Sequence, residues 1–389
     1  MRGRLTGLLA AALLAALALS GCGERAEQAA AGIVTQVVEE VKAPPEGYVP
    51  QNNGFRYAKS LLTSDQQYVY DQLVAGIEAQ ETEIKDLYPD TEMIFAAAKA
   101  LHRDYPEFFW FNGGGKVNTT LLGDVPVSAV YLPEYTVDSA TRAVYQEQID
   151  QWTADCLGSI PVGSSDYEKV LGVYRYIIDH TDYQKVDSNS IVNVMVNGYG
   201  LCGCYAMTTQ YLLNRIGVDC TYVSGMAREQ THAWNLVWLD GNPCWLDTTW
   251  GDPVFEGGNP GDGPSYDYFC ITTDDLVRTH TIDDEVWVPY CLCQDYNYYR
   301  HNGRFFDYYD WNTLVGPMET AISGGEKQIA VRFTDRVYEE AKARLFTDMD
   351  ISTLYSQVDQ DLGTAFSRAK QFTYTCNDAL GVITLIFPA

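Results

Sequence analysis

Basic residues are scarce in this sequence. It contains 26 lysines and arginines against 52 aspartates and glutamates, so its formal net charge is −26 at pH 7. A surface this acidic repels phosphate backbones and anionic lipid headgroups, which argues against a nucleic-acid-binding protein. The hydrophobic fraction of 46% and the charged fraction of 20% are nevertheless those of a globular protein. With 389 residues, the chain has room for two or three domains.

The N-terminus lacks an apolar run of the length that a membrane-spanning helix needs. Residues 8–19 consist almost wholly of Leu and Ala, but this run is too short to span a bilayer comfortably. Arg2 and Arg4 precede it and small residues follow it, which is the order found in a cleaved signal peptide. We therefore predict a signal peptide over residues 1–21.

The end of this predicted signal resembles the processing site of bacterial lipoproteins. Leu19-Ser20-Gly21-Cys22 carries the resemblance, which implies cleavage before Cys22, lipid attachment to its sulfur and an extracytoplasmic protein anchored to the bacterial cell membrane. Ordinary secretion with a coincidental cysteine is the alternative. Residues 22–51 are rich in Ala, Glu and Gln, a composition typical of a flexible tether between a lipid and a folded body.

The spacing of the cysteines does not favour a zinc site. The chain has two Cys-x-Cys pairs, at residues 202–204 and 291–293, whereas structural zinc sites usually separate their cysteines by two to four residues. No histidine pair suited to a metal accompanies them, so we expect no metal and no other cofactor. Apart from Cys22 and Cys202, both disulfides and buried free thiols remain open for Cys156, Cys204, Cys220, Cys244, Cys270, Cys291, Cys293 and Cys376.

Three residues suited to thiol chemistry occur in order within residues 198–252. They are Cys202, His232 and Asp247. A cysteine becomes a strong nucleophile when a nearby imidazole takes its proton, and a third group fixes which imidazole nitrogen carries the hydrogen. The alternative is that these are three unrelated residues of the core or of loops.

Local patterns predict how these residues are positioned. Residues 205–215 are compatible with a helix that Gly217 ends, so Cys202 would lie at or just before a helix N-terminus. There the dipole and the free backbone amides stabilise a thiolate and can also donate to an oxyanion. Cys204 is the competing thiol, and we expect it to point to a different face of the helix.

A hairpin is predicted to join the other two residues. Residues 240–242, Asp-Gly-Asn, lie between two alternating segments, a strong hairpin signal. The hairpin would place His232 near one end of a strand and Asp247 on its neighbour, within reach of the imidazole. Trp234 and Trp250 would either shape a cleft or pack in the core.

Three motifs in this region resemble those of the transglutaminase-like superfamily, whose core is related to the papain fold. The resemblance implies that Cys202 is the nucleophile, His232 the general base and acid, and Asp247 the orienting carboxylate. Cys204 departs from the motif, where glycine is usual, so its thiol would either crowd the site or form a protective disulfide. The motifs are Gly200-Leu201-Cys202-Gly203-Cys204-Tyr205-Ala206, His232-Ala233-Trp234-Asn235 and Asp247-Thr248-Thr249-Trp250-Gly251-Asp252-Pro253.

The resemblance implies an α+β fold with an antiparallel sheet and the nucleophile at a helix N-terminus. We place an N-terminal α+β accessory domain at residues 52–158, the catalytic domain at 159–315 and a C-terminal α+β accessory domain at 316–389. The implied activity is acyl transfer on peptide or protein amides through a thioester, as a peptidase or amidase with water or as a transglutaminase with an amine. A non-catalytic binding module for cell-wall or protein ligands is the alternative. The expected partners are a peptide or protein substrate and, through the lipid anchor alone, the membrane.

The flanking regions show periodic patterns but no reactive cluster. His180 is expected to cap a helix, and His280 and His301 are expected to be structural. Ser165 and Glu168 have the spacing of a capping box. Helices are predicted at residues 64–80, 91–103, 141–156, 335–345 and 351–362, and strands at 108–111, 127–132 (bounded by Pro126 and Pro133), 328–333, 372–376 and 382–387.

Overall fold

The computed structural model describes residues 48–122, 124–252, 263–283, 287–369 and 371–388, together with residues 32, 35, 36 and 44. The predicted signal peptide, Cys22 and most of the predicted tether lie outside the described residues. Within the described part of the chain, no helix combines the length and the apolarity needed to cross a bilayer. The chain divides into two compact units, one ending at Glu147 and the other beginning at Gln148.

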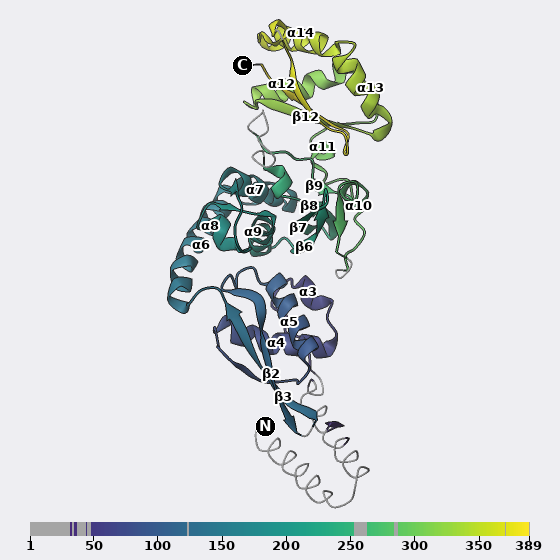
Figure 1. Ribbon diagram of the computed structural model, residues 1–389. Coiled ribbons are helices and arrows are strands. Elements are labelled where there is room, and N and C mark those ends of the chain that lie inside the picture. The colour runs from purple at the N-terminus through teal and green to yellow at the C-terminus, as the bar shows by residue number, and fades with distance from the viewer. Residues whose placement is uncertain are drawn as a thin grey trace, which may run out of the picture. The chain divides into compact units, whose positions relative to one another are not determined.

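Among its described residues, the first unit contains three complete helices and a three-stranded antiparallel sheet in the order β1-β3-β2. Helix α5 packs on β2, and α4 packs on α5 and β1 (Figure 1). The two longer helices confirm the predicted periodicity. The elements are α3 (Tyr57–Ser60), α4 (Ser64–Glu78), β1 (Ile84–Leu87), α5 (Thr91–Asp104), β2 (Phe111–Leu122) and β3 (Val125–Tyr135).

Two predictions in this unit were wrong. Pro126 and Pro133 do not bound a strand but lie inside β3. Strand β1 pairs with β3 only opposite residues 129–131, so both prolines lie where β3 has a single partner and no second ladder needs their missing N–H. The aromatic run is not a strand either, because residues 108–110 form a turn before β2. Its rings still pack in the core, where Phe108 stacks on Tyr105 with centroids 4.6 Å apart.

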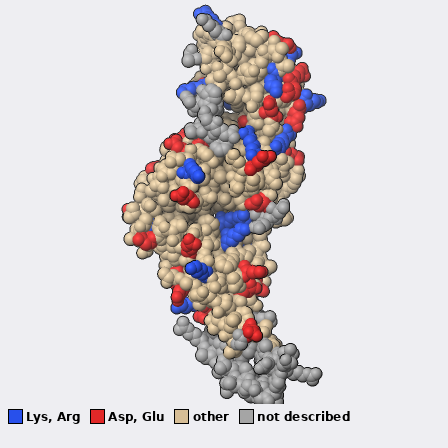
Figure 2. All heavy atoms as spheres, in the orientation of Figure 1, with Lys and Arg blue, Asp and Glu red and all other residues tan. Residues whose placement is uncertain are grey.

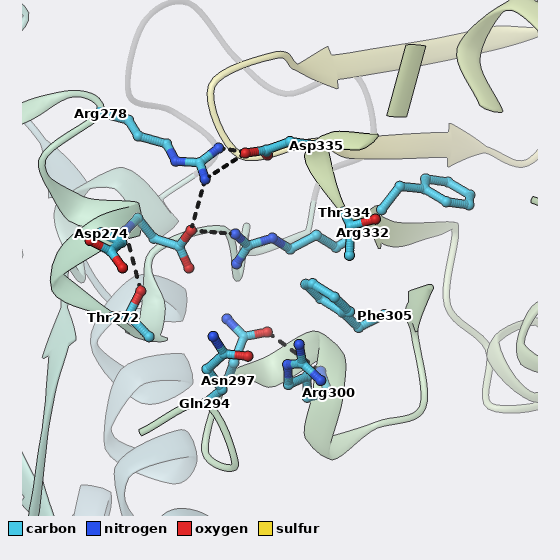
Figure 3. A pocket seen from close by; sticks show the side chains of 12 residues that line it. Thr272, Asp274, Arg278, Gln294, Asn297, Arg300, Phe305, Arg332, Thr334 and Asp335 are labelled. Atoms are coloured by element: carbon cyan, nitrogen blue, oxygen red, sulfur yellow. Dashed lines mark hydrogen bonds and ion pairs between the residues drawn. The ribbon is translucent and has the colours of Figure 1, made fainter. Parts of the chain in front are cut away.

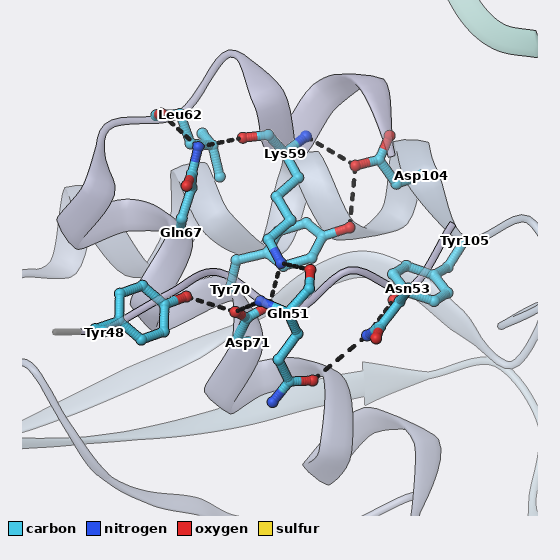
Figure 4. Close-up of polar contacts among 10 residues, drawn as sticks. All are labelled: Tyr48, Gln51, Asn53, Lys59, Leu62, Gln67, Tyr70, Asp71, Asp104 and Tyr105. Atoms are coloured by element: carbon cyan, nitrogen blue, oxygen red, sulfur yellow. Dashed lines mark hydrogen bonds and ion pairs between the residues drawn. The ribbon is translucent and has the colours of Figure 1, made fainter. Parts of the chain in front are cut away.

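A buried polar network ties the start of this unit together (Figure 4). The carboxylate of Asp104 accepts hydrogen bonds from the backbone N–H groups of Ala58 and Lys59 and from the hydroxyl of Tyr70. The Lys59 ammonium lies 2.5 Å from the Asp71 carboxylate. Burial raises the pKa of Asp104 to about 6, although all three of its hydrogen bonds oppose this rise.

The second unit begins within α6 (Ser139–Ser159) and contains a five-stranded antiparallel sheet in the order β10-β6-β7-β8-β9. Helix α9 packs on β6 and β7, and α7 and α8 pack on α9 (Figure 1). The elements are α7 (Asp166–Asp179), β4 (Asp182–Tyr183), α8 (Ile191–Met195), β5 (Tyr199–Gly200), α9 (Cys202–Arg215), β6 (Cys220–Ala227), β7 (Gln230–Leu239), β8 (Asn242–Leu246), η1 (Thr249–Gly251), β9 (Phe269–Ile271), α10 (Thr273–Leu276), β10 (His280–Ile282) and α11 (Tyr298–His301).

Local sequence signals explain two of these elements. Helix α7 begins at the predicted capping box, in which the Ser165 N–H donates to Glu168 Oε2 at 2.7 Å and the Glu168 N–H donates to Ser165 Oγ at 3.3 Å. The β7–β8 hairpin turns at Asp240 and Gly241, whose φ angles are 49° and 78°. Positive φ at both central residues is the signature of a type I′ turn, so the predicted hairpin is confirmed.

The C-terminal part of this unit forms a mixed four-stranded sheet in the order β11-β12-β14-β13. It packs on α12, α13 and α14 through a core that includes Val331, Leu345, Tyr355 and Ile383. Strand β11 lies before residue 316, where the C-terminal accessory domain is predicted to begin, and it pairs in parallel with β12, which lies after that residue. The elements are β11 (Phe305–Phe306), η2 (Trp311–Leu314), α12 (Val315–Ser323), β12 (Gln328–Phe333), α13 (Asp335–Phe346), α14 (Asp350–Leu362), η3 (Phe366–Arg368), β13 (Thr373–Asn377) and β14 (Val382–Ile386).

Charges of both signs are mixed on the surface. Figure 2 shows acidic and basic side chains interspersed over the described residues of one face.

Candidate active site

Cys202 is the first residue of α9. The preceding residue, Leu201, is extended, and its carbonyl accepts hydrogen bonds from the N–H groups of Cys204 and Tyr205. The N–H groups of Cys202 and Gly203 have no helical acceptor because they belong to the first turn. The thiol of Cys202 is half-buried and lies at the positive end of the helix dipole, as the sequence predicts.

His232 and Asp247 meet at the end of the predicted hairpin. His232 lies on β7, and Asp247 follows the last residue of β8. The His232 Nε2 lies 2.7 Å from Asp247 Oδ2, and the two side chains are 6% and 1% exposed. The other carboxylate oxygen of Asp247 accepts the backbone N–H of Trp250 at 3.1 Å. The carboxylate is therefore held from both sides and oriented toward the imidazole.

The electrostatics of this pair favour a charged imidazole. Burial lowers the pKa of His232, but the Asp247 carboxylate and a hydrogen bond with the Cys202 thiol raise that pKa to about 10. For Asp247, burial acts to raise the pKa, and the hydrogen bonds and charges of His232 and His280 hold it well below its usual range. Nε2 of His232 faces Asp247, so Nδ1 is the ring nitrogen that remains for a hydrogen bond with the Cys202 thiol. The structure thus brings His232 and Asp247 into contact, and Cys202 acts on the same imidazole.

A second histidine, which the sequence analysis did not assign to the site, contacts the same carboxylate. His280 is the first residue of β10, and its Nε2 lies 3.3 Å from Asp247 Oδ2. Its Nδ1 lies 2.9 Å from the hydroxyl of Thr279, so a neutral His280 can accept from Thr279 and donate to Asp247. No motif marks this residue, because only the pairing of β10 with β6 brings it to the site.

These three side chains are also spaced as metal ligands could be. The ligand atoms of His232, Asp247 and His280 lie within 4.8 Å of one another, and all three residues are buried. Two imidazoles and a carboxylate suit several transition metals. Here Asp247 Oδ2 accepts hydrogen bonds from both rings, which accounts for this spacing without a metal.

Tyr183 is another residue near the thiol that the sequence did not reveal. It lies on β4, which pairs with β5 immediately before the nucleophile motif. Burial, followed by the negative charges of Cys202 and Asp247, raises the pKa of Tyr183 to about 12. Its hydroxyl therefore stays neutral and keeps its proton beside the reacting sulfur.

Cys204 points away from the nucleophile. Its sulfur is buried and lies 3.7 Å from Asn189 Oδ1 and 3.9 Å from the Ser188 carbonyl. Residues two apart on a helix are separated by about 200°, so Cys202 and Cys204 face different surroundings. Every cysteine among the described residues is a free thiol, including both of these. Cys204 neither crowds the reacting thiol nor bonds to it.

Buried hydrogen bonds hold the three motifs in register. Asn235, on β7, donates to the Ala206 carbonyl of α9 at 2.9 Å. The Tyr205 hydroxyl of α9 donates at 2.6 Å to Oδ2 of Asp252, which belongs to the same motif as Asp247. The motif residues that are not catalytic candidates therefore connect the helix carrying the thiol to the segments carrying the imidazole and the carboxylate.

The two tryptophans have different places. Trp234 is fully buried, so it packs in the core. Trp250 is half-buried, its ring centroid lies 5.5 Å from that of His232, and the Arg228 guanidinium lies 4.9 Å from the ring. Both rings flank the His232 imidazole, since the Trp234 centroid lies 5.8 Å from that of His232, but only Trp250 is partly exposed.

Comparison with known proteins finds a family match over the same stretch of the chain. Residues 160–249 match the family model of the transglutaminase-like superfamily. The central fold is transglutaminase-like. The mouse kyphoscoliosis peptidase is 23% identical over 194 residues, which cover 43% of this chain and 29% of the mouse protein. The chain thus spans less than a third of that relative's length.

Two solved structures are similar to part of the chain. The crystal structure of a TGase overlaps 38% of this chain and 46% of its own, with 16% identity and a TM-score of 0.27. A Cytophaga hutchinsonii protein, provisionally assigned as a cysteine protease, overlaps 36% of this chain and 64% of its own, with 16% identity and a TM-score of 0.25.

Proposed function

We propose that this protein is a cysteine-dependent acyl-transfer enzyme that acts on peptide or protein amides through a thioester. The observation that carries the proposal is the buried 2.7 Å contact between His232 and Asp247, together with the place of Cys202 at the N-terminus of α9. A cysteine, an imidazole and an orienting carboxylate in one line are the elements of nucleophilic acyl transfer. The match to the transglutaminase-like superfamily supports the same chemistry.

The proposed reaction has two halves. The Cys202 sulfur attacks the amide carbonyl carbon, the C–N bond of the resulting tetrahedral intermediate breaks, and the departing amine takes a proton from His232. Water or a second amine then attacks the thioester, His232 accepts its proton, and the Cys202 sulfur leaves. Asp247 stabilises the charged form of His232 through both halves.

The negative oxygen of each tetrahedral intermediate needs donors. We assign the backbone N–H of Cys202 to this role, because it lies in the first turn of α9 and has no helical acceptor. The neutral hydroxyl of Tyr183 is a second candidate.

We favour water over an amine as the acceptor, which makes the enzyme a peptidase or amidase rather than a transglutaminase. The name of the mouse relative, a peptidase, is consistent with hydrolysis. We further propose that the protein is lipid-anchored through Cys22 on the outer side of a bacterial membrane, where cell-wall peptides and surface proteins are its candidate substrates. Labelling of cells with a fatty acid should mark the wild type and not Cys22→Ser.

The thiol chemistry is tested first by alkylation. The full chain is treated with iodoacetamide near neutral pH without reductant, and the rate at each cysteine is followed by peptide mass. We expect Cys202 to react faster than the exposed thiol of Cys376, and its rate to fall in His232→Ala. Cys204→Ala is the matched control, since that residue lies on the same helix and should leave the rate unchanged. Equal rates at Cys202 and Cys376 would falsify the activated nucleophile.

The acceptor is tested with a protein substrate. Casein is incubated with the enzyme and a fluorescent primary amine, with Cys202→Ala as the inactive control. Cys202-dependent release of soluble fragments supports hydrolysis. Cys202-dependent incorporation of the amine without fragments supports a transglutaminase instead.

A further inference from the structure

A cavity lies in the same unit as the candidate active site, and none of the residues of that site line it. Its volume is about 240 Å³. One side comes from residues 294–300, around α11, and the other from β11 and β12 of the C-terminal sheet. In Figure 3, Asn297, Gln294 and Arg300 lie on one side of the gap and Arg332 on the other.

The first unusual feature of the cavity is Arg332. This residue of β12 is only 5% exposed, and its Nη2 donates to Asp275 Oδ1 at 2.5 Å. That ion pair fixes the plane of the guanidinium. The Nε of Arg332 has no hydrogen-bond partner among the described residues. A buried donor left without an acceptor is destabilising by about 1–3 kcal/mol, so an acceptor from elsewhere would be favoured here.

Asn297 presents a second unpartnered donor. It is 3% exposed, and its Oδ1 accepts the backbone N–H groups of Tyr299 and Arg300 at 3.1 and 3.4 Å. Because Oδ1 is engaged in this cap, the amide cannot be flipped, and Nδ2 must point the other way. Nδ2 has no partner within the described part of the chain.

Arg300 adds a positive charge to the same side. Its guanidinium lies 4.2 Å from the centroid of the Phe305 ring, and no carboxylate pairs with it in the described residues. Two acids at the cavity are engaged in ion pairs, Asp275 with Arg332 and Asp335 with Arg278, and the third, Asp274, accepts a hydrogen bond from the Tyr290 hydroxyl. The cavity therefore has two unpartnered donors, the Arg300 cation, the Asp274 carboxylate and an aromatic face.

We propose that this cavity binds the carboxylate of a small peptide or amino acid. Asn297 Nδ2 and Arg332 Nε supply hydrogen bonds to the carboxylate, Arg300 supplies charge, and Phe305 contacts the adjoining apolar atoms. Because Asp274 also lines the cavity, a singly charged carboxylate is repelled less there than a doubly charged phosphate is. The site does not depend on the thiol chemistry proposed above.

Calorimetric titration of the full chain tests this site. The probes are N-acetyl-dialanine, its C-terminal amide and inorganic phosphate. We expect the acid to bind at least about ten-fold more tightly than the amide or phosphate, because only the acid is a singly charged carboxylate. Equal affinity for acid and amide, or no binding of the acid, overturns the site. Tighter binding of phosphate overturns the carboxylate assignment.

Asn297→Asp is the sharpest variant. Aspartate caps a helix as well as asparagine does, so the fold should be kept while the donor is replaced by a negative charge. We expect Asn297→Asp and Arg300→Gln each to weaken binding of the acid about ten-fold or more, and wild-type affinity in Asn297→Asp contradicts the assignment. Asp310→Asn, at another N-cap of the same unit, is the control that should bind normally.

Titration of Cys202→Ala separates this proposal from the catalytic one. Retained affinity for the acid in that variant supports a site independent of the thiol. Loss of affinity there contradicts it and places the carboxylate at the candidate active site instead.

Discussion

Replacement of Asp247 by asparagine should disable the candidate nucleophile while leaving the fold intact. The wild-type carboxylate accepts the Trp250 N–H at one oxygen and the ring N–H groups of His232 and His280 at the other. In Asp247→Asn, if the amide oxygen still accepts the hydrogen bond from the Trp250 N–H, the NH₂ group faces two imidazole nitrogens. His232 must then present a bare Nε2, which moves its proton to Nδ1, the nitrogen that should receive the proton of Cys202.

The size of this effect follows from the pKa of His232. That pKa is about 10, against 6.5 for an ordinary imidazole. One pH unit corresponds to about 1.4 kcal/mol, so the site favours the imidazolium by roughly 4–5 kcal/mol. If most of this comes from Asp247, Asp247→Asn should reduce the equilibrium constant for proton transfer from Cys202 to His232 by about 10³-fold, and turnover by a similar factor or more.

The assay is iodoacetamide alkylation at pH 6, read separately at each cysteine by peptide mass. An ordinary thiol is almost wholly protonated at this pH, so Cys202 should react much faster than Cys376 in the wild type and at a comparable rate in Asp247→Asn. Asp104→Asn is the matched control, because Asp104 is also buried but lies in the first unit. A wild-type rate at Cys202 in Asp247→Asn would refute the role of the carboxylate.

Three further outcomes are expected. Alkylation of Cys202 by a pH-insensitive reagent, and turnover, should change as pH rises through about 10, where His232 loses its proton. The stability that His232 contributes is complete below about pH 6.5 and should be lost towards pH 10, and melting curves of wild type and Asp247→Asn can show this loss. His280→Gln should slow alkylation of Cys202 by less than Asp247→Asn does, because Asp247 keeps its hydrogen bond to His232, and an effect as large as that of Asp247→Asn would contradict this order. In the first unit, Asp104 has a raised pKa of about 6, so its contribution to stability should be greatest below about pH 4 and should fall as pH rises to about 6; chemical denaturation should show this slope in the wild type and not in Asp104→Asn.

The sequence alone predicts the parts of the site that local patterns encode. The Asp240-Gly241 turn fixes the β7–β8 register, and that register brings His232 to Asp247. The start of α9 follows from the glycines around Cys202 and the helix-compatible run after it. These features depend on residues that are near one another in the chain, so a pattern can reveal them.

Other parts depend on contacts between distant segments and leave no local trace. His280 reaches Asp247 only because β10 pairs with β6. The same holds for β3, where Pro126 and Pro133 are tolerated because β1 is too short to pair opposite them. A proline is a reliable strand breaker only where the strand has two partners, and the number of partners is a property of the sheet.

The pairing of β11 with β12 determines where this chain can be cut. A fragment ending at residue 315 would keep Phe305 and Phe306 but lose the strand they pair with, leaving an exposed apolar edge. It would also leave Asp275 buried without Arg332, and loss of one partner from a buried pair is destabilising by about 3–5 kcal/mol. The C-terminal sheet and the transglutaminase-like region are therefore expected to be inherited, expressed and unfolded as one piece.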